Sequence, residues 1–133
     1  MAHEEPLAAF VDSSAIVALV DQDDAAHGAA VGAYGELSGS GYRLFTTDHV
    51  VVETYDLLLN GVGPVVAATW LRTNRLPVYA TDESDLAAAQ AILAGRPDDA
   101  PISIVDALSL AVMERLGVAD AFAVDPSFLA ALS

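Results

Sequence analysis

The sequence predicts a single α/β domain, built as a mainly parallel sheet of four or five strands with helices on both faces. Two observations predict this class. Short apolar runs typical of buried strands alternate with longer stretches of helical period, and this alternation favours parallel strands joined by helices. The 133 residues, 54% of them hydrophobic, suffice for one buried core, so we expect one domain over residues 1–133.

Start and stop signals bound the elements expected in the first half of the chain. Ser13 or Ser14 can cap a helix after the first strand, and Asp48 can cap the third helix, which Gly61 ends. Pro64 suits the first turn of the following helix. The expected elements are a strand over 7–11, helices over 13–20 and 23–37, a strand over 43–46, and helices over 48–60 and 64–73.

The second half of the chain is punctuated in the same way. Thr81 and Ser103 are expected to cap two helices, which Gly95 and Gly117 end. Pro126 opens a final helical turn. The expected elements are a strand over 76–79, helices over 82–93 and 103–116, a strand over 121–124, and a short helix from 126.

Four carboxylates fall where this architecture would gather them at one edge of the sheet. Asp12 and Asp125 directly follow the first and last strands, and α/β sheets bind ligands outside the carboxyl ends of their strands. Glu53 lies about one helical turn beyond the same edge. Asp106 lies in the first turn of its helix, where the helix dipole favours an anion. Hard ions such as Mg²⁺ or Mn²⁺ prefer oxygen ligands, so the quartet predicts phosphodiester hydrolysis by metal-activated water.

A purely structural interpretation exists for each acid taken alone. Asp12 and Asp125 could be no more than helix N-caps. Glu53 shares its helical face with other polar residues, which is typical of a solvated helix, and the position of Asp106 does not by itself predict burial. The joint pattern favours a site, because two strand ends and two helix faces point to one place.

The charge of the chain is unusual. It has 19 acidic residues, five arginines and no lysine, for a net charge of −14. We expect a halophilic source, because about 1 M salt shortens the Debye length to about 3 Å and screens the self-repulsion of such a surface. The alternative is a merely acidic, alanine-rich mesophilic protein. The same charge disfavours ordinary nucleic-acid binding, so an RNA substrate would need bound metal and salt to remove most of the repulsion.

Other classes of chemistry lack the residues that they need. The absence of cysteine excludes disulfides, thiolate zinc sites and a cysteine nucleophile, and it fits a reducing cytoplasm. The chain has no Walker-type phosphate loop and no dinucleotide-binding fingerprint, and its three histidines are not at zinc-ligand spacing. No apolar run approaches the roughly 20 residues of a transmembrane helix. The start of the chain lacks a secretory signal, so we expect a cytoplasmic protein that makes no membrane contact.

Four segments of the chain resemble the PIN-domain nucleases, and among them the VapC-type toxins of toxin–antitoxin pairs. The segments are Phe10–Ala15, Thr46–Thr54, Ser103–Met113 and Ala121–Phe128, in this order and spacing. The resemblance spans nearly the whole chain, and the first and third segments are the more specific. In similar sequences a basic residue or histidine and then phenylalanine often follow the fourth acid, whereas here Pro126 and Ser127 fill that gap.

The resemblance implies a Rossmann-like sheet and an endoribonuclease that uses Mg²⁺ or Mn²⁺. By the same resemblance Asp12, Glu53 and Asp106 bind the principal metal ion, and Asp125 binds it directly or through water. Hydroxyl side chains would orient the carboxylates or the phosphate. These hydroxyl residues are Ser13, Thr47 and Ser103.

The resemblance also implies protein partners. We expect a homodimer and a small cognate antitoxin that enters the active-site groove, where an arginine of the antitoxin could displace or mimic the metal. Two alternatives remain at this point. One is a non-toxin PIN nuclease of RNA maturation or decay, and the other is a PIN-like domain that has lost catalysis and serves as an interaction module.

Overall fold

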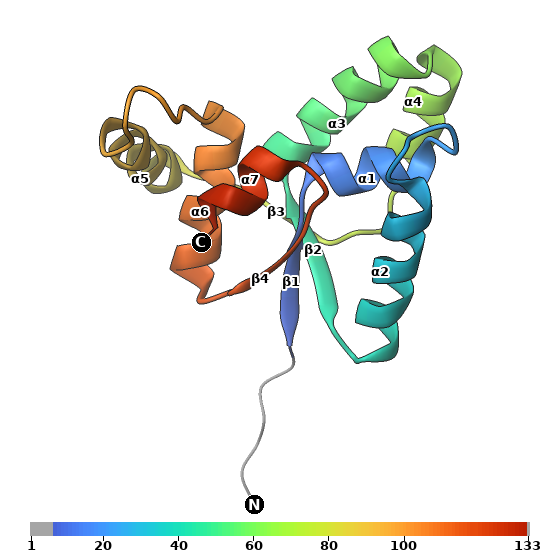
Figure 1. Cartoon of the computed structure of the whole chain (residues 1–133), viewed down its shortest axis with the longest axis horizontal. Coiled ribbons are helices and arrows are strands. Elements are labelled where there is room, and N and C mark those ends of the chain that lie inside the picture. Colours follow the sequence, from blue (N-terminus) through green and yellow to red (C-terminus); the bar gives the residue numbers. More distant parts are fainter. Residues whose placement is uncertain (1–6, 133) are drawn as a thin grey trace, which may run out of the picture.

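The computed structural model describes residues 7–132, and Figure 1 shows a central sheet between helices. The first half of the chain forms β1 (Ala8–Val11), α1 (Ser13–Val20), α2 (His27–Gly39), β2 (Arg43–Thr47), α3 (Asp48–Gly61) and α4 (Pro64–Thr73). The second half forms β3 (Val78–Tyr79), α5 (Glu83–Ala94), α6 (Ile104–Leu116), β4 (Asp120–Phe122) and α7 (Pro126–Ala131). The predicted α/β class is therefore confirmed, with four strands.

The sheet is parallel throughout, with the strand order β3-β2-β1-β4. The chain proceeds from β1 to β2 and β3 on one side, then returns to place β4 on the other side of β1. The direction of strand addition therefore reverses beside β1. Such a switch point leaves a crevice at the carboxyl ends of the two strands that flank it, where α/β proteins bind ligands.

Helices cover both faces of the sheet, as expected. In Figure 1, α5, α6 and α7 lie on one side of the strands, and α1, α2 and α4 lie on the other. Phe10 of β1 is fully buried at the centre, where its ring contacts Phe45 of β2 at 5.9 Å and Phe128 of α7 at 6.0 Å between centroids. These contacts fix the short α7, and therefore the end of β4, against the central strand.

Three helix caps differ from their predicted positions. Asp12, which the sequence offered as a possible cap, caps α1 in place of Ser13 or Ser14. Thr47, rather than Asp48, caps α3 and accepts a hydrogen bond from the backbone N–H of Val50. Asp82, rather than Thr81, caps α5 in a capping box with Asp85. The caps predicted at Asp48 and Thr81 are displaced because these two side chains instead bond to each other, across 33 residues of the chain.

Several element boundaries also differ from the prediction, most of them by one or two residues. The second helix begins at His27 rather than residue 23, because the carboxylates of Asp21 and Asp24 accept backbone N–H groups two residues ahead and hold turns. Strand β3 is shorter than predicted. Strand β4 ends at Phe122, because the backbone N–H of Val124 donates to a serine hydroxyl outside the sheet. Within residues 7–132, no helix has the length and apolar character needed to cross a bilayer.

Candidate metal centre

Asp12 is the most deeply buried acid of the predicted quartet. It ends β1, caps α1 and is 2% exposed. Its Oδ2 accepts hydrogen bonds from the hydroxyl of Ser14 at 2.6 Å and from the backbone N–H of Ser14 at 3.2 Å. Its Oδ1 is buried with no hydrogen-bond partner. Burial raises the pKa of Asp12, the bonds from Ser14 oppose the rise, and the charge of Asp125 adds to it.

Asp125 follows β4 and caps α7. Its carboxylate accepts hydrogen bonds from the hydroxyl of Ser127 at 3.0 and 3.1 Å. Its backbone N–H donates to the hydroxyl of Ser14 at 3.2 Å, as does that of Val124 at 3.0 Å. Ser14 therefore joins the end of β1 to the end of β4, so that Asp12 and Asp125 flank the switch point of the sheet.

Glu53 comes to this place from the second turn of α3. It is half-buried, and its Oε1 accepts a hydrogen bond from the hydroxyl of Ser13 on α1. Burial raises the pKa of Glu53, the bond from Ser13 opposes the rise, and the charges of Asp12 and Asp125 reinforce it. Glu53 is thus held in tertiary contact, which the interpretation as a solvated helix face did not anticipate.

Asp106 completes the group from the first turn of α6. It is 9% exposed, so the sequence pattern failed to indicate its burial. Burial raises the pKa of Asp106 to about 6, and the charges of Asp12, Glu53 and Asp125 contribute to the rise. Its backbone N–H donates to the hydroxyl of Ser103, which caps the helix.

The mutual effects on these pKa values place the four carboxylates within electrostatic reach of one another. None of the charges that shift the pKa values of Asp12, Glu53 and Asp106 is positive. Four acids in one crevice without a neutralising charge repel each other, and a bound divalent cation would remove that repulsion. Together with the unpartnered Oδ1 of Asp12, this makes the residues a chemical fit for Mg²⁺ or Mn²⁺.

The carboxylates do not yet form a complete coordination shell. Within residues 7–132, no three acidic or histidine side chains lie close enough to hold an ion as they stand. The reason is visible in the hydrogen bonds, because Glu53 and Asp125 each face a serine hydroxyl. A bound ion would have to compete with Ser13 and Ser127 for those oxygens.

The predicted supporting hydroxyl groups divide into three kinds. Ser13 touches a carboxylate of the quartet directly. Ser103 bonds to the backbone of Asp106 and restrains the rise of the pKa of Asp106. Thr47 is fully buried, and its hydroxyl serves the cap of α3 rather than an acid of the site. The sequence prediction missed Ser14, because its contacts near Asp125 span 110 and 111 residues and leave no local signal.

A pocket of about 370 Å³ opens beside Glu53, lined by residues of α3 and one residue of α6. Three of the lining residues are aliphatic and four are polar. The lining residues are His49, Val52, Glu53, Asp56, Leu57, Asn60 and Val105. Glu53 therefore belongs both to the group of four acids and to the lining of this pocket.

Comparison with known proteins yields a consistent family. Residues 9–131 match the PIN domain family. The chain is 34% identical over 124 residues to the 23S rRNA-specific endonuclease VapC20 of two strains of Mycobacterium tuberculosis, with 92% of each chain covered. The crystal structure of Mycobacterium tuberculosis VapC20, described as a sarcin–ricin loop cleaving toxin, superposes with a TM-score of 0.77. That alignment has 35% identity and covers 92% of this chain and 93% of the other.

Proposed function

Because this chain belongs to the PIN-domain family, we propose that it is a VapC-type toxin endoribonuclease whose four acids hold Mg²⁺ or Mn²⁺. The likeness to an rRNA endonuclease extends over nearly the whole length of both chains, so no separate domain is needed for the activity. The metal dependence and the roles of individual residues form part of the proposal. The acids concerned are Asp12, Glu53, Asp106 and Asp125.

One observation carries the proposal. Oδ1 of Asp12 is buried without a partner, the charge of Asp125 raises the pKa of Asp12, and the charge of Asp12 in turn raises the pKa values of Glu53 and Asp106. An unsatisfied buried oxygen costs free energy, on the order of 1–3 kcal/mol, unless a ligand binds it. A divalent cation is the ligand that satisfies both the oxygen and the surrounding charge.

The residues of the site have separable tasks in this proposal. Asp12, Glu53 and Asp106 hold the principal ion, and Asp125 approaches it directly or through water. When bound, the ion supplies Lewis-acid polarisation of a phosphoryl oxygen and acidifies a water molecule for attack. Ser14 keeps Asp12 oriented by donating to Oδ2, and Ser13 holds Glu53 until the ion competes for its carboxylate.

The substrate class is RNA, and we propose the sarcin–ricin loop of 23S rRNA as the target. The support is the specificity of VapC20, which is 34% identical to this chain. The net charge of −14 adds a condition, because RNA and protein repel each other in dilute buffer. Cleavage should therefore require both the divalent ion and concentrated monovalent salt.

The decisive experiment compares the native protein with Asp106→Asn in about 2 M KCl with Mn²⁺. The substrates are a sarcin–ricin hairpin and a hairpin of the same length with a scrambled loop. We expect the native protein alone to cleave the sarcin–ricin hairpin, and we expect the variant to keep its circular dichroism spectrum. A calorimetric Mn²⁺ titration of both proteins should show saturable binding only in the native chain. Equal cleavage by the variant would remove this site from consideration.

We also propose a cognate antitoxin, a homodimer and a cytoplasmic location. The support for partners is the number of exposed apolar side chains on α3, on α4 and in the turn between them, of which Val52 and Leu57 line the pocket next to Glu53. The residues are Val52, Leu57, Leu59, Val62, Val65 and Leu71. Light scattering on the purified chain tests the dimer, and co-purification with the product of an adjacent antitoxin gene tests the partner.

Two outcomes would favour the alternative functions. Cleavage of many structured RNAs with no effect of any antitoxin would indicate a PIN nuclease of RNA maturation or decay. Saturable Mn²⁺ binding without cleavage of any RNA would indicate an interaction module that retains its metal site. The intact acids at all four positions favour the catalytic proposal over the second alternative.

A further inference from the structure

His49 is a polar group of the pocket that the proposed metal centre does not use. It lies four residues before Glu53 on α3, so the two side chains share one face of that helix. Both line the pocket of about 370 Å³. Of the residues that line this pocket, His49 is the one that can carry a positive charge. The chain has only five arginines and no lysine, so a further cation beside the acids would help to attract RNA.

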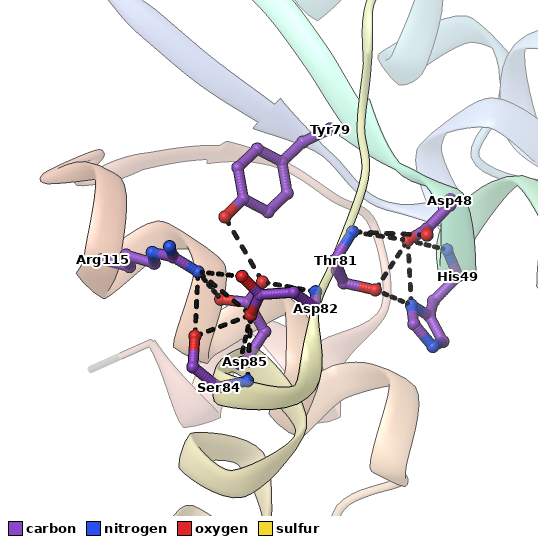
Figure 2. Close-up of polar contacts among 8 residues, drawn as sticks. All are labelled: Asp48, His49, Tyr79, Thr81, Asp82, Ser84, Asp85 and Arg115. Carbon is purple, nitrogen blue, oxygen red and sulfur yellow. Dashed lines mark hydrogen bonds and ion pairs between the residues drawn. The ribbon is translucent and has the colours of Figure 1, made fainter.

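The imidazole of His49 is anchored through one edge. Nδ1 lies 3.0 Å from Oδ1 of Asp48 and 2.7 Å from the hydroxyl of Thr81. Figure 2 shows this edge turned toward both partners and the opposite side of the ring turned away. A carboxylate only accepts, so the contact with Asp48 favours a proton on Nδ1. Nε2, across the ring, remains available to a ligand.

Asp48 and Thr81, which hold the ring of His49, are themselves joined by hydrogen bonds. Thr81 donates its backbone N–H to both oxygens of Asp48 and its hydroxyl to Oδ1 at 2.9 Å. Burial alone would raise the pKa of Asp48, but the hydrogen bonds from Thr81 and His49 outweigh burial and lower it. Asp48 is therefore a charged, well-bonded acceptor for the ring.

The neighbouring residue extends this anchoring to a second helix. Asp82 caps α5, and its carboxylate pairs with Arg115 near the end of α6. Figure 2 shows the loop from Tyr79 to Asp82 lying between this cluster and the Asp48–His49 pair. The ring is thus held by Asp48 and by Thr81, which adjoins the Asp82 cap of α5, although 42% of the His49 side chain is exposed to solvent.

From this arrangement we propose that His49 is a substrate-contacting residue that binds an RNA phosphate next to the scissile one through Nε2, with Asp48 and Thr81 as positioning residues. This inference rests on the proposed ribonuclease function. When both ring nitrogens carry a proton, Nε2 can donate to a phosphate oxygen, and this contact would bind substrate without taking part in bond breaking. This contact would attract RNA to a pocket whose other charged side chains, Glu53 and Asp56, repel RNA.

Steady-state cleavage of the sarcin–ricin hairpin tests the role of the cation. We expect His49→Gln to raise KM about tenfold with kcat changed less than threefold, and His49→Arg to recover most of the loss. Asn60→Ala, which alters another polar group of the same pocket, is the control and should leave KM unchanged. An unaltered KM in His49→Gln, or equal KM values in the glutamine and arginine variants, would overturn the proposal.

A double-mutant cycle tests the positioning. Thr81→Val should raise KM in the native background and have no further effect in His49→Gln, because the hydroxyl contacts the ring and Asp48, and both contacts would affect substrate through the ring. Additive effects of the two changes would overturn the positioning role and indicate a general loosening of the fold. Calorimetric Mn²⁺ affinity should be the same in all of these variants.

A spectroscopic titration separates this inference from the proposed function. The chain has three histidines, so the imidazole proton resonance of His49 can be assigned by its loss in His49→Gln. With Ca²⁺ in place of Mn²⁺, adding the RNA hairpin should shift that resonance and leave the resonance of His27 in place. A shift with Ca²⁺, combined with no cleavage of the same hairpin with Mn²⁺, would support the contact and contradict the nuclease. Cleavage with no shift of His49 would contradict the contact and leave the nuclease standing.

Discussion

The hydroxyl of Ser14 lies 2.6 Å from Oδ2 of Asp12, and this contact commits one oxygen of the buried carboxylate while the other has no partner. The same hydroxyl accepts the backbone N–H groups of Val124 and Asp125. One serine therefore orients the first acid of the site and positions the backbone of the last. Replacement of Ser14 alone should therefore change the orientation of Asp12.

Replacing Ser14 with alanine should weaken metal binding more than it weakens the fold. Loss of a group that orients a metal ligand typically costs about 10–100-fold in affinity. We expect a reduction of that size in a calorimetric Mn²⁺ titration, with a loss of no more than about 2 kcal/mol in urea unfolding. Ser84→Ala is a matched control, since its hydroxyl also lies 2.6 Å from the carboxylate of an N-cap aspartate two residues before it. Equal Mn²⁺ affinity in the two variants would contradict the role of Ser14.

Lowering the pH should stabilise the metal-free protein through Asp106. Its pKa is raised from 3.8 to about 6, so the folded state binds more protons than the unfolded state between these values. Stability from this group therefore falls as pH rises through that window, by at most about 3 kcal/mol. Urea unfolding with a chelator at pH 5 and pH 7 measures the difference.

Two variants isolate the contribution of Asp106 to that pH dependence. Asp106→Asn should be stabilised relative to the native chain at pH 7 and should show a smaller difference between the two pH values. Asp99→Asn, which changes an exposed loop acid, should retain the native difference. If the Asp106→Asn protein kept the full difference, the effect would come from the general charge of the chain. Adding Mn²⁺ at pH 7 should raise the melting temperature of the native protein alone.

Two buried threonines should respond in opposite directions to the same substitution. Thr46 and Thr54 are both fully buried, but the hydroxyl of Thr46 donates to the carbonyl of Val11 at 2.8 Å, whereas that of Thr54 has no partner. Thr46→Val should destabilise the fold by about 1 kcal/mol, and Thr54→Val should be neutral or stabilising. Urea denaturation of the two variants checks this, and a clear loss of stability in Thr54→Val would reveal a partner for that hydroxyl.

Molar salt should stabilise the protein. With a net charge of −14 and no lysine, the acids repel each other across a surface that only salt can screen. A gain of about 2 kcal/mol between 0.1 M and 2 M KCl would raise the melting temperature by roughly 6–10 °C. Sodium sulfate can stabilise proteins by exclusion alone, so KCl is the appropriate salt. A melting temperature independent of KCl would remove the expectation of a halophilic source.

The sequence predicted the order of the elements and the edge at which the acids meet, because both follow from local patterns. Strands and helices are encoded in hydrophobic period, and an acid directly after a strand needs no distant information to be placed. Burial of Asp106 and the tertiary contact of Glu53 with Ser13 were beyond prediction, because they depend on how α1, α3 and α6 pack together. The displaced caps have the same origin, since Asp48 bonds with Thr81 from another element.

The spread of the acids along the chain determines how late in synthesis the four of them can come together. Asp12 is synthesised first, but its neighbour on one side is β4, which ends at Phe122, and Asp125 follows still later. A nascent chain that lacks this last segment has an incomplete sheet and an incomplete set of carboxylates. The proposed ribonuclease activity would therefore begin only after the segment that carries β4 and Asp125 has been made and has folded.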